Sequence, residues 1–218
     1  MTAPSGAGRA GAHCDPAAAA VPWAIPAAAA VWSILFAWRP AAFWPLMAVG
    51  AGGLGAIAMV VRGPFPIREG VRWVDLSTGA AAAAVLYLAF ALGRTAIGRV
   101  FPTAPSQIAD VYTLRALEPA WLIAVLLVAV IGPGEEIFWR GLVLRGLVVR
   151  YGPVIGWGAS TIIYAGVHAA ARNPLLVLAA LVAGGFWGFL YLRTRRIAPI
   201  AVSHAVWDLL VFLVLPFR

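Results

Sequence analysis

Seven apolar stretches, each close to the length needed to cross a bilayer, constrain the fold of this chain more than any other feature. A helix crosses the hydrocarbon core with roughly 20 residues at about 1.5 Å rise each. Backbone polar groups in lipid must pair within their own segment, so such stretches fold as helices. The sequence predicts an all-α polytopic transmembrane bundle of about seven helices, within a range of six to eight. The stretches are residues 21–38, 41–61, 76–97, 119–149, 154–171, 175–192 and 197–215.

Composition supports a membrane protein. Hydrophobic residues make up 63% of the chain and charged residues 11%, against roughly 25% charged in soluble domains. The net charge of +8 comes from arginines scattered between apolar runs, with no basic stripe interleaved with aromatics. We therefore expect no nucleic-acid partner. Cys14 is the single cysteine, which excludes a disulfide framework within one chain.

The sequence divides into three parts. Residues 1–20 are rich in Gly, Ala and Pro, and we expect a disordered tail. Residues 21–117 hold N-terminal transmembrane helices and a polar connection whose apolar positions 108, 111, 114 and 117 predict a short surface helix. Residues 118–215 hold the remaining helices and form the candidate catalytic core.

The fourth stretch is too long for one straight span. It contains Gly132-Pro133-Gly134. Proline removes a helical hydrogen bond and glycine lowers helix stability, so we expect a break or a kink there.

Six ionisable residues lie inside apolar stretches instead of between them. A charged group at the bilayer centre costs at least ~2.5 to 3.5 kcal/mol. Several such costs are tolerated only when the groups meet inside the protein, so we expect the cluster to converge. Read from the loops, His168 and His204 lie toward opposite surfaces, and convergence requires tilted or extended helices. The six residues are Glu135, Glu136, Arg140, His168, His204 and Asp208.

Local spacing predicts how these groups pair. Glu136 and Arg140 are four residues apart and share a helix face. Glu135 is turned about 100° from Glu136, so one carboxylate is neutralised structurally while the other stays free to act as a base. His204 and Asp208 are also one helix turn apart.

Three motifs in these stretches resemble the CPBP family, the CAAX-protease and bacteriocin-processing membrane enzymes. Glu135, Glu136 and Arg140 form Glu-Glu-x-x-x-Arg, and Tyr164 precedes His168 as the aromatic-x-x-x-His motif. The third motif runs from His204 to Asp208. All three occur in the family's order, and the resemblance covers residues 118–215.

The resemblance implies glutamic-type peptide hydrolysis inside the membrane without a cofactor. Glu135 with His168 would activate a water molecule. His204 with Asp208 would stabilise the oxyanion. Glu136 and Arg140 would support the first helix.

The chain departs from the family pattern at two positions. Tyr164 stands where Phe is usual and brings a hydroxyl to the site. Asp208 stands where Asn is common, and an ionised Asp cannot donate a hydrogen bond. Asp208 must therefore be protonated or must orient His204.

Three other functions remain open. Glu135, His168 and His204 could ligate Zn²⁺ in a membrane metalloprotease, although the chain has no His-Glu-x-x-His motif. A Glu and His relay could serve a proton-coupled transporter, although no inverted repeat is evident. The cluster could also be a purely structural polar network.

The substrate is expected to be a peptide or a protein C-terminal segment that enters from the bilayer, and the protein to be a monomer. Nine arginines lie on the tail and alternate loops, and six lie on the other side. By the positive-inside rule, this places a multi-pass protein in the cell membrane with a cytoplasmic N-terminus.

The orientation is testable through Cys14. A membrane-impermeant thiol reagent added outside intact cells should leave Cys14 unmodified and should modify it after the cells are opened. Labelling before lysis would show that the orientation is reversed.

Overall fold

The computed structural model describes residues 15–62 and 70–217, and the regular structure in these two ranges is helical. The α-helices are α1 (Pro16–Trp38), α2 (Phe43–Arg62), α3 (Trp73–Val100), α4 (Ala104–Tyr112), α5 (Ala120–Leu126), α6 (Gly132–Glu136), α7 (Arg145–Tyr151), α8 (Pro153–Val167), α9 (Pro174–Thr194) and α10 (Ala198–Leu209). π-helical turns occupy Leu127–Ile131, Ile137–Leu144 and Leu210–Val214, and 3₁₀ turns occupy Thr113–Leu117 and His168–Ala171.

Six helical segments are long and apolar enough to span a membrane, counted over the described residues. They are Pro16–Trp38, Phe43–Val61, Trp73–Val100, Ala120–Tyr151, Pro153–Ala171 and Pro174–Thr194. The seventh expected stretch forms the shorter apolar helix Ala198–Val214. The all-α polytopic bundle is thus confirmed, and the chain is a multi-pass membrane protein.

The first helix begins earlier than expected. Residues 16–20, which the sequence assigned to a disordered tail, belong to α1. The Asp15 side chain caps the helix by accepting a hydrogen bond from the Ala17 N–H at 2.9 Å, and Pro16 fits the first turn. Asp15 also pairs with Arg145 at 3.0 Å. Residues 1–14 lie outside the described part of the chain.

Of the break or kink expected at Gly132-Pro133-Gly134, the break is wrong, because the helical backbone continues from Ala120 to Tyr151. Pro133 has no backbone N–H to donate, and the turn before it, Leu127–Ile131, is π-helical. In this turn the Gly132 N–H donates to the Leu127 carbonyl five residues earlier. Gly134 serves packing, since a Cβ there would lie 2.6 Å from the Ala51 carbonyl oxygen of α2. Gly134 therefore allows α6 and α2 to approach closely.

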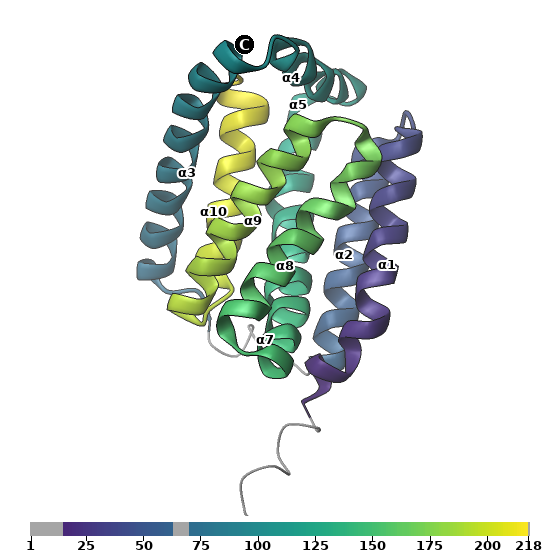
Figure 1. The fold of residues 1–218 in the computed structure, drawn as a ribbon, viewed down its shortest axis with the longest axis vertical. Helices are drawn as coiled ribbons and strands as arrows, with labels where there is room; N and C mark the ends of the chain where they lie inside the picture. The colour runs from purple at the N-terminus through teal and green to yellow at the C-terminus, as the bar shows by residue number, and fades with distance from the viewer. Residues whose placement is uncertain (1–14, 63–69, 218) are drawn as a thin grey trace, which may run out of the picture.

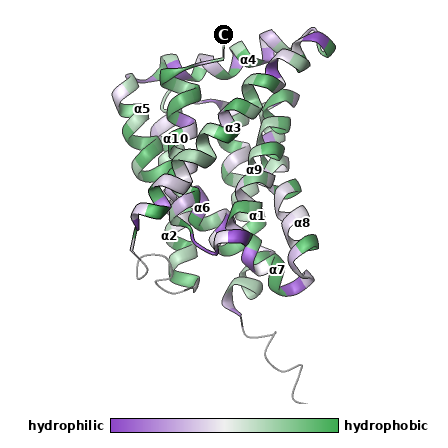
Figure 2. Ribbon diagram, turned by 90° about the vertical axis from the view of Figure 1, so that its left-hand side faces the viewer, coloured by the Kyte–Doolittle hydropathy of each residue, from purple (hydrophilic) through white to green (hydrophobic). Residues whose placement is uncertain are grey.

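Figure 1 shows how the helices are arranged, with α1 and α2 along one edge of the bundle and α3 beside α10 at the other. The α5–α7 segment runs through the interior, and α8 and α9 cover one side of it. Helix α4 and the turn Thr113–Leu117 lie across one end, where the sequence predicts a surface helix. Hydrophobic residues dominate along the helices in Figure 2.

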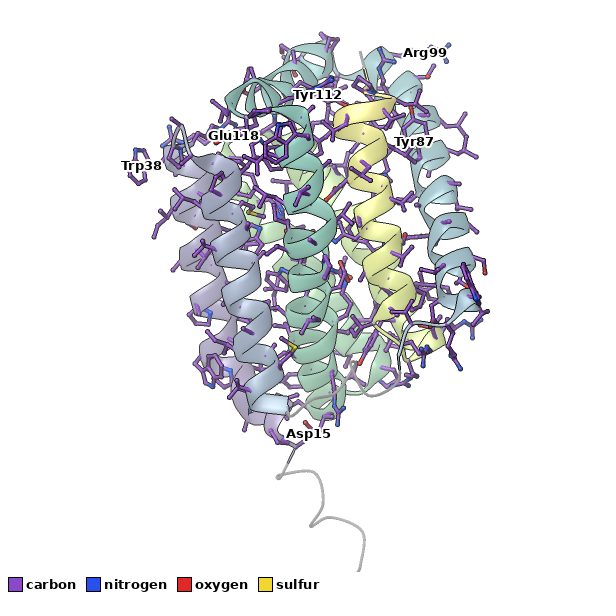
Figure 3. All side chains as sticks on the ribbon, turned by 180° about the vertical axis from the view of Figure 1, so that it is seen from behind. Asp15, Trp38, Tyr87, Arg99, Tyr112 and Glu118 are labelled. Atoms are coloured by element: carbon purple, nitrogen blue, oxygen red, sulfur yellow. The ribbon has the colours of Figure 1, made fainter. Side chains whose placement is uncertain are left out.

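Ion pairs join the helices near both ends of the bundle. Asp15 and Trp38 mark the two ends of the bundle in Figure 3. Near the start of α3, Arg196 binds Asp75 at 2.7 Å. At the opposite end, Arg39 holds Asp110 of α4 through two hydrogen bonds of 2.7 and 2.8 Å. The Arg39 guanidinium lowers the pKa of the Asp110 carboxyl below its ordinary value. The pair fixes α4 over the end of the bundle.

Helix α3 packs tightly against α10 at Gly79. A Cβ on this residue would lie 2.6 Å from Val202 and 2.7 Å from the Pro199 carbonyl oxygen. Without a hydrophobic driving force between helices in lipid, such small residues set how closely helices pack. The contact at Gly79 therefore determines the distance between α3 and α10.

A matched pair of glycine substitutions in α3 tests this contact. We expect Gly79→Ala to destabilise the protein by about 1–3 kcal/mol, because the new methyl group overpacks against backbone. Gly98→Ala is the control, since a Cβ there meets nothing within 4 Å. Thermal unfolding in detergent should show a lower Tm for Gly79→Ala alone. Equal Tm values for the two variants would contradict the tight contact.

Candidate active site

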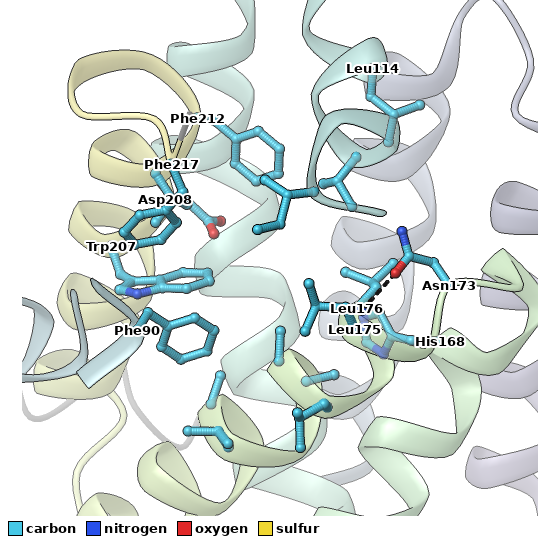
Figure 4. A pocket seen from close by; sticks show the side chains of 18 of the residues that line it. Phe90, Leu114, His168, Asn173, Leu175, Leu176, Trp207, Asp208, Phe212 and Phe217 are labelled. Atoms are coloured by element: carbon cyan, nitrogen blue, oxygen red, sulfur yellow. Dashed lines mark hydrogen bonds between the residues drawn. The ribbon is translucent and has the colours of Figure 1, made fainter. Parts of the chain in front are cut away.

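A cavity of about 330 Å³ lies inside the bundle, and most of its lining is apolar. Glu135 of α6, His168 at the end of α8, and His204 and Asp208 of α10 all contribute to its lining. In Figure 4, Asp208 and His168 lie on opposite sides of this space. The structure therefore brings to one cavity four side chains that the sequence places on three segments.

The two adjacent glutamates have different surroundings. Glu135 lines the cavity, whereas Glu136 and Arg140 do not contribute to the lining. Glu136 Oε1 accepts hydrogen bonds from Arg140 Nη1 at 3.0 Å and from His204 Nδ1 at 2.7 Å. Arg140 Nη2 donates to the Gly184 carbonyl of α9 at 3.2 Å. Glu136 and Arg140 thus join three segments behind the cavity wall.

Glu135 accepts a hydrogen bond from Tyr164, whose hydroxyl the sequence placed at the site without identifying its partner. The Tyr164 hydroxyl donates to Glu135 Oε2 at 3.1 Å, and both side chains are buried. The same tyrosine ring lies 4.8 Å from the Arg140 guanidinium, within cation–π range. Tyrosine in place of phenylalanine therefore orients one oxygen of the Glu135 carboxylate.

His168 is oriented by its own helix. Its Nδ1 lies 2.8 Å from the Tyr164 carbonyl oxygen. A carbonyl only accepts, so in this contact Nδ1 carries the proton and Nε2 of the neutral ring is an acceptor. The ring also packs against Phe36, with centroids 5.2 Å apart. This geometry presents a histidine whose free nitrogen can accept a proton.

His204 lies between two carboxylates and against an indole. Its ring stacks on Trp187 of α9, with centroids 4.0 Å apart and planes 22° apart. Nδ1 binds Glu136, and Nε2 lies 3.5 Å from Asp208 Oδ2. The second distance is too long for a strong hydrogen bond but short enough for an ionic contact. The ring is thereby held on three sides.

The sequence did not predict two parts of this arrangement. It paired Glu136 with Arg140 alone, while the structure adds His204 as a second partner. It did not identify Trp187, which supports His204 and donates to Ser203 at 3.1 Å. Gly184 packs closely against this cluster, since a Cβ there would lie 2.7 Å from the Tyr164 ring. No spacing within one helix signals the contacts of His204 and Trp187.

A metal site has little geometric support. In residues 15–62 and 70–217, no group of three His, Cys, Asp or Glu side chains is arranged to hold a metal ion. Glu135, His168 and His204 line the same cavity, but they do not form such a group. A zinc enzyme would therefore require these side chains to move.

The fold and the cavity define a class: a multi-pass helical membrane protein with buried carboxylates and histidines around an apolar space. Residues 117–210 match the family model of the type II CAAX prenyl endopeptidases, described as Rce1-like. This match to a CPBP-family model covers less than half of the 218 residues and overlaps the region 118–215 that the three motifs identify. The family indicates an intramembrane peptidase. No curated protein and no solved structure matches the chain.

The buried pair of Glu136 and Arg140 predicts a loss of stability when the carboxylate is removed. Glu136→Gln leaves the buried Arg140 charge with a weaker partner, and breaking buried pairs typically costs about 3–5 kcal/mol. We expect a lower Tm and a lower yield of folded protein in detergent. Glu118→Gln, which changes a carboxylate outside the cluster, should behave as the parent. A Glu136→Gln protein as stable as the parent would contradict the structural role.

Proposed function

We propose that this protein is an intramembrane endopeptidase that hydrolyses a peptide bond in a membrane-associated peptide or protein C-terminal segment. One observation carries the proposal: Glu135 faces the cavity with His168, His204 and Asp208, while Glu136 is bound behind the wall. A purely structural network would not require one of two adjacent carboxylates to face an open space. The resemblance of the three motifs supports the same activity.

Glu135 and His168 are assigned to the water-activating step. The carboxylate accepts a proton from a water molecule, and the resulting hydroxide attacks the scissile carbonyl carbon. The C–N bond of the tetrahedral intermediate then breaks, and the proton passes to the leaving amine. His168 positions the water through Nε2, because its Nδ1 is bound to the Tyr164 carbonyl. The Tyr164 hydroxyl keeps Glu135 in place.

His204 is assigned to the oxyanion. When both ring nitrogens carry protons, Nδ1 donates to Glu136 and Nε2 can donate to the developing negative charge. Asp208, 3.5 Å from Nε2, orients the ring from the cavity side. Trp187 prevents the ring from tilting.

The cavity also favours a membrane-associated substrate. Its walls are mostly apolar and belong to helices long enough to span lipid, which suits an apolar peptide segment that comes from the bilayer. We propose that the substrate enters from the bilayer, that the protein acts as a monomer, and that no metal is required.

Glu135→Gln tests the proposed base. The amide keeps the shape and loses the basicity, so hydrolysis should fall to background while Tm and yield stay close to the parent. Cleavage is measured by mass spectrometry of membrane-associated candidate peptides incubated with the purified protein. Full hydrolysis by Glu135→Gln would overturn the assignment. The same assay is repeated with a metal chelator, because strong inhibition that Zn²⁺ reverses would favour the metal mechanism.

Asp208→Asn separates two roles for the residue beside His204. If Asp208 donated directly to the oxyanion, asparagine would replace it with little loss. If Asp208 orients His204 as a carboxylate, turnover should fall roughly 10- to 100-fold, by analogy with residues that orient metal ligands. We expect the larger loss in kcat, with KM and Tm nearly unchanged. Parent-like kcat across pH 6 to 8 would show that the orienting role is wrong.

A further inference from the structure

The Trp187 indole of α9 makes two different contacts with neighbouring residues of α10. Its face stacks on the His204 ring, with centroids 4.0 Å apart and planes 22° apart. Its Nε1–H donates to the Ser203 hydroxyl at 3.1 Å, and both side chains are buried. Side chains of consecutive helical residues point about 100° apart, so the face and the N–H edge of one indole meet different sides of α10. Ser203 and His204 therefore hold the same indole from two directions.

The two contacts restrict different motions of the indole. Stacking keeps the two ring planes close to parallel, but it leaves the indole free to rotate within its own plane. The hydrogen bond to Ser203 has a preferred direction along the N–H bond, and it opposes this rotation. The Trp207 ring adds an edge contact to Trp187, with centroids 5.8 Å apart and planes 84° apart. The indole is therefore a fixed surface against which His204 lies.

The need to pair a buried indole N–H is a simpler explanation of the Ser203 hydroxyl, and two other tryptophans argue against it. Trp32 and Trp139 are as buried as Trp187, yet their Nε1 atoms have no protein partner within residues 15–62 and 70–217. Burial of an indole in this bundle thus does not require a protein acceptor. The acceptor of Trp187 directly precedes the histidine that Trp187 supports. Its place in the chain therefore points to His204.

The indole determines where the second nitrogen of His204 points. Glu136 holds Nδ1 at 2.7 Å, but a ring held at one atom can still swing its far side. The stacked indole limits this swing, so that Nε2 stays on the cavity side, 3.5 Å from Asp208. Trp187 and His204 line the cavity, whereas Ser203 does not. Ser203 therefore acts on His204 without touching a ligand in the cavity.

We propose that Ser203 is a positioning residue of this site: its hydroxyl fixes the Trp187 indole, and the indole fixes the direction in which His204 Nε2 meets the oxyanion. Ser203 lies directly before the His204–Asp208 motif and is not part of it. The proposal rests on the proposed function for the oxyanion, but the placement of the His204 ring is measurable without hydrolysis.

A double-mutant cycle tests whether Ser203 acts through the indole. Ser203→Ala should lower kcat about 3- to 10-fold, the size of effect of one hydrogen bond. KM and Tm should stay close to the parent, because the oxyanion forms in the transition state and not in the bound substrate. Trp187→Phe keeps an aromatic face and removes the N–H, so adding Ser203→Ala to it should cause no further loss. Losses that multiply in the double variant would overturn the proposal.

Ser160→Ala is the matched control, because Ser160 is also a buried serine and does not line the cavity. Removing this hydroxyl from α8 should leave kcat unchanged. An equal loss of kcat in the two serine variants would be a general effect of losing a buried hydroxyl, and it would also overturn the proposal.

The position of the His204 ring is read without a substrate, by NMR of the protein with isotope-labelled histidine in detergent. The chain has three histidines, His13, His168 and His204, so that single substitutions assign their ring C–H signals. An indole stacked at 4.0 Å shifts the His204 signal upfield through its ring current. Ser203→Ala should move this signal, and Ser160→Ala should leave it in place. A His204 signal that Ser203→Ala does not move would overturn the proposal.

Failure of this proposal can be distinguished from failure of the proposed function. If the parent hydrolyses no peptide while the His204 signal depends on Ser203, the peptidase is contradicted and the positioning of His204 by Ser203 stands. If the parent hydrolyses peptides while Ser203→Ala changes neither kcat nor the His204 signal, the positioning role is wrong and the peptidase stands.

Discussion

The arrangement of the whole site depends on one buried carboxylate, Glu136. Its Oε1 accepts from Arg140 on the same segment and from His204 on α10, and Arg140 reaches the Gly184 carbonyl of α9. Each group alone would be an uncompensated polar burial in a membrane-spanning bundle. Together they fix the mutual register of three segments. The register in turn brings Glu135, Asp208 and the His204 ring to the same cavity.

The different surroundings of Glu135 and Glu136 follow from helix geometry. Two consecutive residues on a helix point about 100° apart, so adjacent carboxylates cannot occupy the same surroundings. Glu136 is fully buried among its partners, whereas Glu135 lines the cavity and, within residues 15–62 and 70–217, its side chain is hydrogen-bonded to the Tyr164 hydroxyl alone. A network of hydrogen bonds on one side can therefore fix a helix whose other side carries a less restrained carboxylate.

The sequence predicts what depends on spacing within one segment. The seven apolar stretches and the Glu136–Arg140 pair needed only chain length and the period of the helix. The contacts of His204 with Glu136 and Trp187 depend on the register between helices, which no local pattern encodes. The absence of the break at Gly132-Pro133-Gly134 has the same origin, because tertiary packing against α2 and a π-helical turn outweighed the local preference for a break.

Close helix packing is the condition for the polar network. Lipid provides no hydrophobic drive between helices, so their separation is determined by how closely side chains and backbones fit. Gly134 packs on the backbone of α2, and Gly184 packs on the Tyr164 ring that orients Glu135. A methyl group at Gly184 would displace this ring, and with it the hydroxyl on the carboxylate. The chemistry proposed for Glu135 therefore depends on a glycine that touches no substrate.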